Sequence, residues 1–232
     1  MSAIIHLPIF GLTLTLAVYL LALRLHERFG RHALLTPVFT TTVVVSLVLE
    51  VTGLPYAEYL EQVSVLVLLL GPATVALALP LLANARALRS SAPAVLVTLV
   101  IGSAVSVGVT LGALLLLGAP PEIVRSTLTR NVTSPVALSI TEIIHGSASL
   151  AVVLTIVSGI LGAVFAPWLL SLTGVRDERA RGFAIGLTSH GIGTSRALAE
   201  SETAGGWSSA GMVLSALSMT LALPVVAHLA LG

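Results

Sequence analysis

The stretch Pro93-Ala-Val-Leu-Val-Thr-Leu-Val-Ile-Gly-Ser-Ala-Val-Ser-Val-Gly-Val-Thr-Leu-Gly-Ala-Leu-Leu-Leu-Leu117 decides the fold class of this chain. It holds 25 residues and no charge, and a helix of about 20 apolar residues crosses the roughly 30 Å hydrocarbon core of a bilayer. Five more long apolar runs lie on either side of it, at residues 3–23, 34–54, 63–82, 149–172 and 207–231. Hydropathy therefore predicts six transmembrane helices.

The composition of the whole chain agrees with a bilayer as its solvent. Of its 232 residues, 56% are hydrophobic and 9% are charged, whereas soluble domains carry about 25% charged residues. The formal net charge is +1, and no basic tract suggests nucleic-acid binding. The absence of Cys excludes thiolate chemistry. We expect an all-α integral membrane protein made of a single polytopic domain over residues 1–232, free of nucleic acid.

The arginines predict an orientation. Arg-rich connections follow the first and third runs, and a third lies near position 178, whereas residues 55–62 hold two Glu and no basic residue. The positive-inside rule places the Arg-rich connections in the cytoplasm and the N-terminus outside. Residues 120–146 and 181–206 are too polar to face lipid, and the same rule favours each returning to the side it left. We therefore expect two re-entrant hairpins or broken helices beside the six spans.

The first polar interval contains Arg130-Asn-Val-Thr-Ser-Pro135. Ser, Thr or Asn followed by Pro is typical of a helix start, and a buried helix start presents free N–H groups to an anion. A snorkelling Arg on an ordinary capped helix is the alternative. Glu142, two turns beyond Pro135, is either a proton or cation site or an interfacial partner of His145. The candidate substrate residues here are Arg130, Asn131, Thr133 and Ser134.

The second interval reads Gly182-Phe-Ala-Ile-Gly-Leu-Thr-Ser-His-Gly-Ile-Gly-Thr-Ser-Arg196. Gly191 and Gly193 permit a backbone break, and His190 could hold a proton or an anion, or could be a hydrogen-bonded structural group. Arg196 and Glu200 are spaced for an i,i+4 ion pair, or could gate a cavity. The candidate substrate residues here are Ser189, His190, Thr194, Ser195 and Arg196.

A third break is expected at Gly71-Pro72, in the middle of the run over residues 63–82. Thr74 follows it and is a further candidate for binding substrate. Val-Ala-Leu follows a Pro both there and after Pro135, which suggests repeats over about residues 1–90 and 91–232. An ordinary kink is the alternative.

Catalysis is the least supported class of function. The chain has no Gly-x-Ser-x-Gly elbow and no His-Glu-x-x-His motif. We predict no enzyme, no catalytic residue, no metal site and no cofactor beyond coupled H⁺ or Na⁺.

Four ordered blocks resemble the CidB/LrgB family: Leu70-Gly-Pro-Ala-Thr-Val-Ala-Leu-Ala-Leu-Pro80, Asn131-Val-Thr-Ser-Pro-Val-Ala-Leu138, Ser158-Gly-Ile-Leu-Gly-Ala-Val164 and Ser189-His-Gly-Ile-Gly-Thr-Ser-Arg-Ala-Leu198. The resemblance extends over essentially the whole chain. Family members often have Lys-Ser where this chain has Arg130-Asn131, and Gly-Gly-Ile-Pro where it has His145-Gly-Ser-Ala148.

The resemblance implies two functions. The family includes a plant plastid glycolate/glycerate translocator and bacterial members associated with pyruvate uptake, which implies a carrier for small monocarboxylates that works by alternating access. It also includes holin-like and antiholin-like proteins linked to murein hydrolase activity and autolysis, which is the alternative. The same resemblance implies the inner membrane of a bacterium and a small CidA/LrgA-type partner. We also expect a homo-oligomer.

Overall fold

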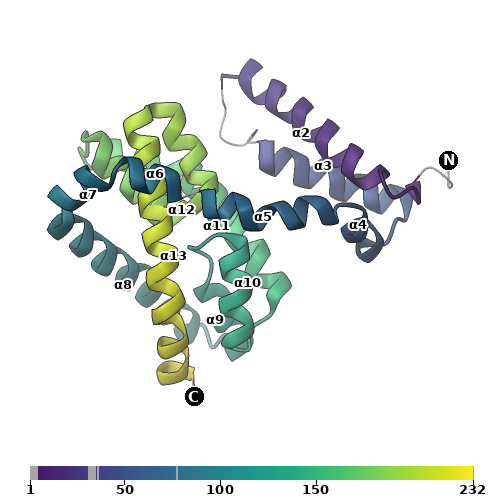
Figure 1. Ribbon diagram of the computed structural model, residues 1–232. Helices are drawn as coiled ribbons and strands as arrows, with labels where there is room; N and C mark the ends of the chain where they lie inside the picture. The colour runs from purple at the N-terminus through teal and green to yellow at the C-terminus, as the bar shows by residue number, and fades with distance from the viewer. Residues whose placement is uncertain (1–4, 31–34, 36, 77, 232) are drawn as a thin grey trace. The chain divides into compact units, whose positions relative to one another are not determined.

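The computed structural model describes residues 5–30, 35, 37–76 and 78–231, together with most of their side chains. Every regular element in these ranges is a helix (Figure 1). The chain divides into two compact units, Met1–Ala76 and Leu77–Gly232. The prediction of an all-α membrane protein is confirmed, because four of the described helices are long and apolar enough to cross a bilayer.

The first unit contains α2 (Phe10–Arg28), α3 (Pro37–Thr52), α4 (Tyr56–Gln62) and α5 (Ser64–Ala76). Polar side chains join α2 to α4, because Gln62 Oε1 accepts a hydrogen bond of 2.8 Å from the Gly11 N–H. The Thr15 and Tyr59 hydroxyls lie 2.7 Å apart. At 16 residues, α3 spans about 24 Å and is shorter than a typical crossing helix.

The expected break at Gly71-Pro72 lies inside a helix. α5 passes through Pro72 and ends at Ala76, and α6 (Ala78–Ala83) begins two residues later, in the second unit. The residue between the two helices, Leu77, and the side chain of Thr74 lie outside the described part of the chain. The role of Thr74 stays a prediction.

The second unit is built around three long apolar helices. After α6 and the short α7 (Ala85–Ser90), these helices are α8 (Ala92–Leu116), α11 (Ala148–Leu172) and α13 (Glu202–Leu231). At 1.5 Å per residue, α8 and α11 are each about 37 Å long, enough to cross the hydrocarbon core. Most of the large apolar side chains of these helices are exposed, as expected for helices whose surface faces lipid.

Both polar intervals fold as pairs of short helices. The first hairpin comprises α9 (Pro121–Leu128) and α10 (Ser134–Ile143), joined by residues 129–133. The second hairpin is α12 (Glu178–Glu200), which is broken at His190, where φ is 40° and ψ is −133°. Arg181 and Glu200 form a salt bridge of 3.0 Å across its base, so its two arms run antiparallel.

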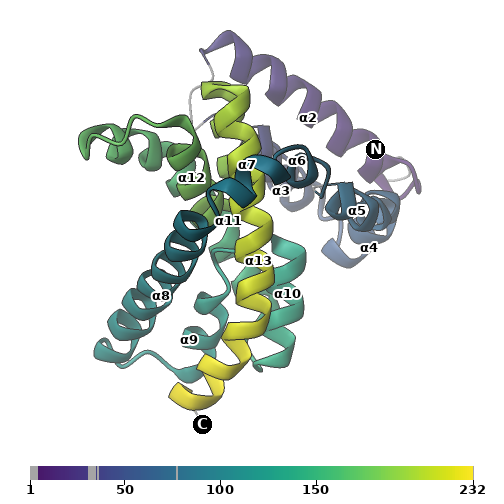
Figure 2. The same cartoon turned by 60° about the vertical axis from the view of Figure 1, so that its left-hand side comes forward.

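The two hairpins enter from opposite ends of the second unit. The first lies near the end of α13, where Arg125 Nη2 is 3.5 Å from the Leu231 carbonyl oxygen. The second begins beside the end of α11, where Arg181 Nη1 donates to Ser171 Oγ at 3.1 Å. Figures 1 and 2 agree that α12 flanks the first half of α13 and that α9 and α10 flank the second half. Each hairpin thus begins and ends at the same end of the second unit, and its return to the same side of the membrane stays a prediction.

Glycines allow the second hairpin to lie directly against α13. A methyl group on Gly182 would collide with the carbonyl oxygen of Ala204, and one on Gly186 would collide with that of Ser208. Both contacts are with backbone atoms, which a side-chain movement cannot relieve. The spacing of four residues on both helices makes this a close, parallel helix contact.

Candidate functional site

The tip of the first hairpin carries a network centred on Arg130. Its Nη2 donates to Thr110 Oγ1 at 2.6 Å and to Ser106 Oγ at 3.3 Å, and both acceptors belong to α8. Asn131 Nδ2 also donates to Ser106 Oγ, and Arg130 Nη1 lies 3.3 Å from Asn131 Oδ1. Polar side chains therefore fasten the tip to α8, beside an apolar cluster that holds Val132 and is packed by Val107 and Leu111 of α8.

Every hydrogen-bond partner of Arg130 is electrically neutral. Its side chain is half-buried, and no carboxylate of the described residues lies within ion-pair distance of it. A guanidinium inside a membrane protein is costly unless an anion or a water-filled cavity compensates its charge. Arg130 is thus a cation whose counter-ion the described part of the chain does not supply.

The sequence prediction of a helix start at this tip is confirmed. α10 begins at Ser134, with Thr133 at the N-cap in an extended conformation and Pro135 in the first turn. The Thr133 side chain makes no capping hydrogen bond, so the tip leaves N–H groups of the first turn free of a side-chain cap. Thr133 and Ser134 are both half-buried and lie three and four residues after Arg130.

The tip of the second hairpin is His190, and its backbone conformation makes the break. A φ of 40° with a ψ of −133° is a region that glycine adopts at the least cost. The ring is 4% exposed, and Nε2 lies 3.0 Å from the carbonyl oxygen of Thr155 on α11. A carbonyl oxygen only accepts, so Nε2 carries a proton and the ring is held in one orientation.

Buried hydroxyl groups surround this second tip. Thr194 Oγ1 donates to the His190 carbonyl oxygen at 2.8 Å and lies 2.9 Å from Ser208 Oγ of α13. Ser189 is fully buried against Gly162 of α11, where an added methyl group would collide with its hydroxyl. The hydroxyl of Thr155 is buried without a hydrogen-bond partner among the described residues, so it can still bond to a water molecule or a ligand.

The two hairpins contact neighbouring positions on α8 and on α13, about one helical turn apart. On α8, Gly102 packs against Leu187 of the second hairpin, and Ser106, four residues later, binds the first hairpin. On α13, Ser215 Oγ donates to the Leu187 carbonyl oxygen at 3.4 Å, and Met219 shares an apolar cluster with Val132. Four residues of helix correspond to about 6 Å.

The hairpin arms are long enough to reach the middle of a bilayer from one of its surfaces. The arms of the second hairpin, residues 178–189 and 191–200, are about 18 and 15 Å long. Those of the first hairpin, α9 and α10, are about 12 and 15 Å long. These lengths are close to half of a hydrocarbon core of about 30 Å.

Other predicted residues lie away from the tips. Ser195 is exposed and donates to the Ile192 carbonyl oxygen at 2.7 Å, and Arg196 is half-buried one residue further on. Glu142 is exposed in the last turn of α10, about 12 Å along the helix from Ser134. Its part in proton or cation coupling stays a prediction.

One predicted ion pair is wrong. Glu200 binds Arg181, with Nε–Oε2 at 3.0 Å and Nη2–Oε1 at 3.2 Å, and not Arg196. The i,i+4 spacing considered only one helix, whereas the break at His190 brings the start of α12 beside its end.

Sequence reasoning missed the residues on the long helices that receive the tips. These are Ser106, Thr110, Thr155 and Ser208, which lie in apolar runs. Ser103, like Thr155, has a buried hydroxyl with no partner among the described residues. A signal was present, because Gly102, Ser106 and Thr110 recur every four residues and so share one face of α8.

The donor set defines what this site can bind. Among the described residues, no group of three His, Asp or Glu lies close enough to hold a metal ion. The tips offer one guanidinium, an amide, several hydroxyls and a helix start, which are the groups that recognise a carboxylate or another small anion.

The fold and the site together define a multi-pass α-helical membrane protein with two hairpins that contact neighbouring positions on its long helices. A family model described as LrgB-like matches residues 15–229, and the chain belongs to this family. The resemblance to CidB/LrgB proteins is therefore confirmed.

Named relatives cover nearly the whole chain. Uncharacterized protein YwbG of Bacillus subtilis is 32% identical over 216 residues, which are 93% of this chain and 96% of the relative. Holin-like protein CidB of Staphylococcus epidermidis is 25% identical over 213 residues, which are 92% of this chain and 93% of the relative. A protein of Haemophilus influenzae is 31% identical over 214 residues, 92% of each chain. No solved structure matches.

Proposed function

We propose that this membrane protein binds a small organic monocarboxylate between the two hairpin tips and carries it across the bilayer. The observation behind the proposal is the charge of Arg130, which lies at the first tip and has only neutral hydrogen-bond partners. A carboxylate would supply the missing counter-ion, and a guanidinium binds it through two parallel hydrogen bonds. Pyruvate, glycolate and glycerate are the expected substrates.

The arrangement of the hairpins supports a carrier over a static binding protein. Each hairpin closes the site from a different end of the second unit, so movement of either one would open the tips to one side only. The close glycine contacts of α12 with α13 provide a surface along which such a movement can occur. Substrate movement coupled to H⁺ or Na⁺ through Glu142 or His190 is part of the proposal.

Uptake into proteoliposomes tests the carrier. Purified full-length protein is reconstituted, and labelled pyruvate, glycolate and glycerate are offered with no gradient, a pH gradient or a Na⁺ gradient. We expect saturable uptake of at least one of them, and protein-free liposomes provide the background. Absence of uptake under all gradients, in a preparation that is folded and inserted, contradicts the carrier.

A second candidate is a holin-like or antiholin-like regulator of murein hydrolase activity and autolysis. The name of the CidB relatives, holin-like protein, favours this candidate and mentions no transported substrate. The comparisons thus support it more than they support the carrier, whereas the geometry of the tips favours the carrier. Release of large dyes from liposomes that contain only this protein would establish a pore and reverse the order of the two proposals.

Three further expectations belong to these proposals. We infer a bacterial inner membrane, with the N-terminus outside, a homo-oligomer and a small CidA/LrgA-type membrane partner. Labelling of single Cys residues added before α2 tests the orientation, and the lack of native Cys makes this straightforward. Chemical cross-linking with and without the co-expressed partner tests the assembly. We propose no enzymatic activity.

A further inference from the structure

A pocket lies at one end of the second unit, away from the hairpin tips. Its volume is about 810 Å³, and Arg86, Asn84 and Ser90 line it from the α7 segment while Arg179 lines it from the first turn of α12. No Asp or Glu is among the described residues that line it. The pocket therefore joins two positive charges from segments that are far apart in the sequence.

The packing of the second hairpin holds one of these charges in place. The Arg179 guanidinium lies over the Trp207 ring, 5.9 Å from its centroid, and the Trp207 side chain is 4% exposed. An arginine stacked on an aromatic face keeps its N–H groups free to point outward in the plane of the guanidinium. Arg179 thus contributes a charge with a restricted direction to the pocket.

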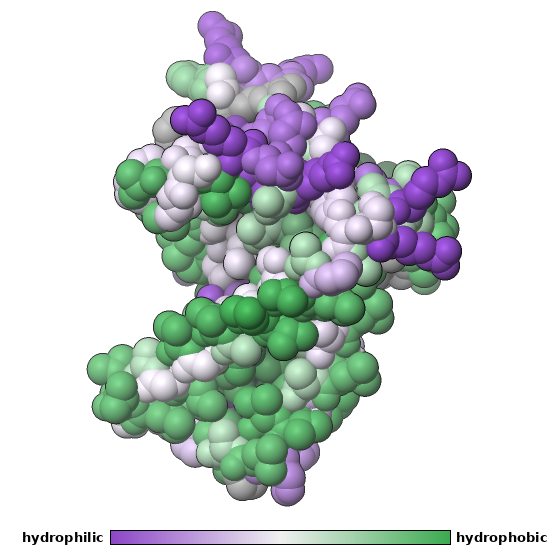
Figure 3. All heavy atoms as spheres, turned by 90° about the vertical axis from the view of Figure 1, so that its left-hand side faces the viewer, coloured by the Kyte–Doolittle hydropathy of each residue, from purple (hydrophilic) through white to green (hydrophobic). Residues whose placement is uncertain are grey.

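The pocket lies where a phosphate group would meet the protein. Hydrophilic side chains gather at the end of the second unit where α7 and the start of α12 lie, above an apolar flank (Figure 3). α7 is only six residues long and precedes the transmembrane helix α8, which is the level of the lipid headgroups. The positive-inside rule assigns this end to the cytoplasm, where the leaflet is anionic.

We propose that this pocket binds a phosphate-bearing anion, with Arg86 and Arg179 holding its oxygens. Two guanidinium groups without a lining carboxylate match the charge and planar hydrogen-bonding geometry of a phosphate. The phosphate can come from the headgroup of an anionic lipid or from a soluble phosphate ester. Its binding ties α7 to the first turn of the second hairpin, and it is independent of the proposed carboxylate transport.

The experiment measures binding to the purified full-length protein in detergent. One arm titrates phosphatidylglycerol against phosphatidylcholine with the same acyl chains, followed by native mass spectrometry. The other arm adds inorganic phosphate or glycerol 3-phosphate and measures thermal stabilisation and competition with the lipid. Preference for phosphatidylglycerol without competition identifies the lipid as the source, and competition by the soluble ligands identifies a soluble ester.

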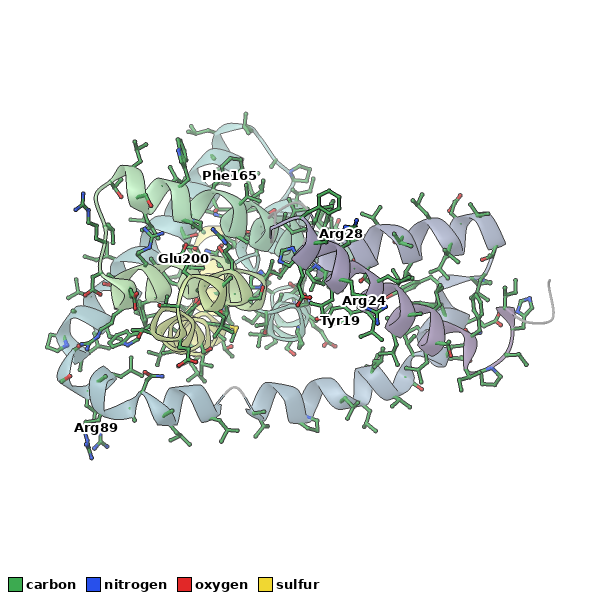
Figure 4. The ribbon with its side chains drawn as sticks, turned by 90° about the horizontal axis from the view of Figure 1, so that it is seen from above. Tyr19, Arg24, Arg28, Arg89, Phe165 and Glu200 are labelled. Atoms are coloured by element: carbon green, nitrogen blue, oxygen red, sulfur yellow. The ribbon has the colours of Figure 1, made fainter. Side chains whose placement is uncertain are left out.

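The matched variants remove equal charge inside and outside the pocket. Arg86→Gln with Arg179→Gln is compared with Arg89→Gln with Arg176→Gln. All four arginines are exposed, and only Arg86 and Arg179 line the pocket. Figure 4 shows Arg89 at the corner of α7, extending away from the surrounding helices. We expect the pocket variant to lose at least about tenfold in affinity and the control to stay within about twofold.

Two results would overturn the proposal. One is an equal loss in both double variants, which would reduce the effect to general surface charge. The other is binding that distinguishes neither phosphatidylglycerol from phosphatidylcholine nor phosphate from chloride. Arg86→Gln alone, compared with Arg89→Gln on the same short helix, leaves the Arg179–Trp207 contact intact. This comparison of single variants keeps the test valid if the double variant fails to fold.

Discussion

Arg130 Nη2 lies 2.6 Å from Thr110 Oγ1, and this hydrogen bond joins the tip of the first hairpin to the charge-free helix α8. Thr110 Oγ1 also donates to the Ser106 carbonyl oxygen at 2.7 Å, so its lone pairs face the guanidinium. The contact fixes where the positive charge sits inside the protein. It leaves that charge without a carboxylate partner among the described residues.

Replacement of Arg130 by Gln should abolish carboxylate uptake. The loss is expected to be about 100-fold or more, because a charge-assisted pair inside a site contributes about 3 kcal/mol. Arg125→Gln on the neighbouring α9 is the matched control and should retain uptake. Proteoliposome uptake normalised to inserted protein measures both variants, and wild-type uptake by Arg130→Gln would remove this residue from the site.

Two substitutions of His190 distinguish the role of its backbone conformation from the role of its imidazole. His190→Gly keeps the break in α12 at little cost, because glycine adopts positive φ readily, while it removes the imidazole. His190→Ala removes the ring and retains the backbone strain, so it should melt at a lower temperature than His190→Gly. We expect both variants to lose uptake. Transport by His190→Gly at the wild-type rate would show that only the bend is needed.

Thr133→Val tests the helix start at the first tip. Valine has nearly the same shape and lacks the hydroxyl, so the protein should fold and insert normally while uptake falls by about tenfold. Thr127→Val, on the exposed side of α9, is the control and should leave uptake unchanged. Equal uptake by the wild type and by Thr133→Val would exclude the hydroxyl from substrate binding.

Gly186→Ala should loosen the second hairpin. The added methyl group would meet the Ser208 carbonyl oxygen, and overpacking of this kind costs about 1–3 kcal/mol. Gly112→Ala on α8, where nothing lies within 4 Å of the added methyl group, should cause no loss of stability. Thermal unfolding in detergent compares the two, and equal melting temperatures would contradict the close approach of α12 to α13.

The Arg181–Glu200 salt bridge should hold the base of the second hairpin closed. Both side chains are mostly buried, at 14% and 20% exposed, so Glu200→Gln should cost about 1–3 kcal/mol. We expect faster hydrogen exchange over residues 178–200, and partial recovery in the exchanged pair Arg181→Glu with Glu200→Arg. Arg196→Gln should leave the exchange rate of the hairpin base unchanged. An ion pair between Arg196 and Glu200 would instead predict faster exchange in this variant.

The unit formed by Met1–Ala76 takes no part in these predictions, although it carries features of its own. Tyr19, Arg24 and Arg28 all come from α2, as Figure 4 shows. Its α2–α4 contact depends on Gly11, because a methyl group there would lie 2.8 Å from Gln62 Oε1. That close approach explains a glycine in a helix that is otherwise long and apolar.

The sequence by itself determined where the chain lies and where its helices break. A charge-free run such as residues 93–117 has no stable alternative to a helix in lipid, because every backbone group must be hydrogen-bonded within the segment. Polar, Gly-rich and Pro-containing intervals cannot face lipid, so their burial as hairpins followed from composition. The start of α10 at Ser134 was also readable, since Thr and Ser followed by Pro are typical of a helix start.

Only the tertiary structure decided which polar groups meet. Ser106 and Thr155 lie in runs whose hydropathy predicts lipid contact, and their role comes from the faces that α8 and α11 turn toward the tips. The pairing of Arg181 with Glu200 required the fold at His190, which brings residues 19 apart in sequence together. Sequence spacing describes neighbours along one helix, whereas the site is made by contacts between helices, and these depend on packing.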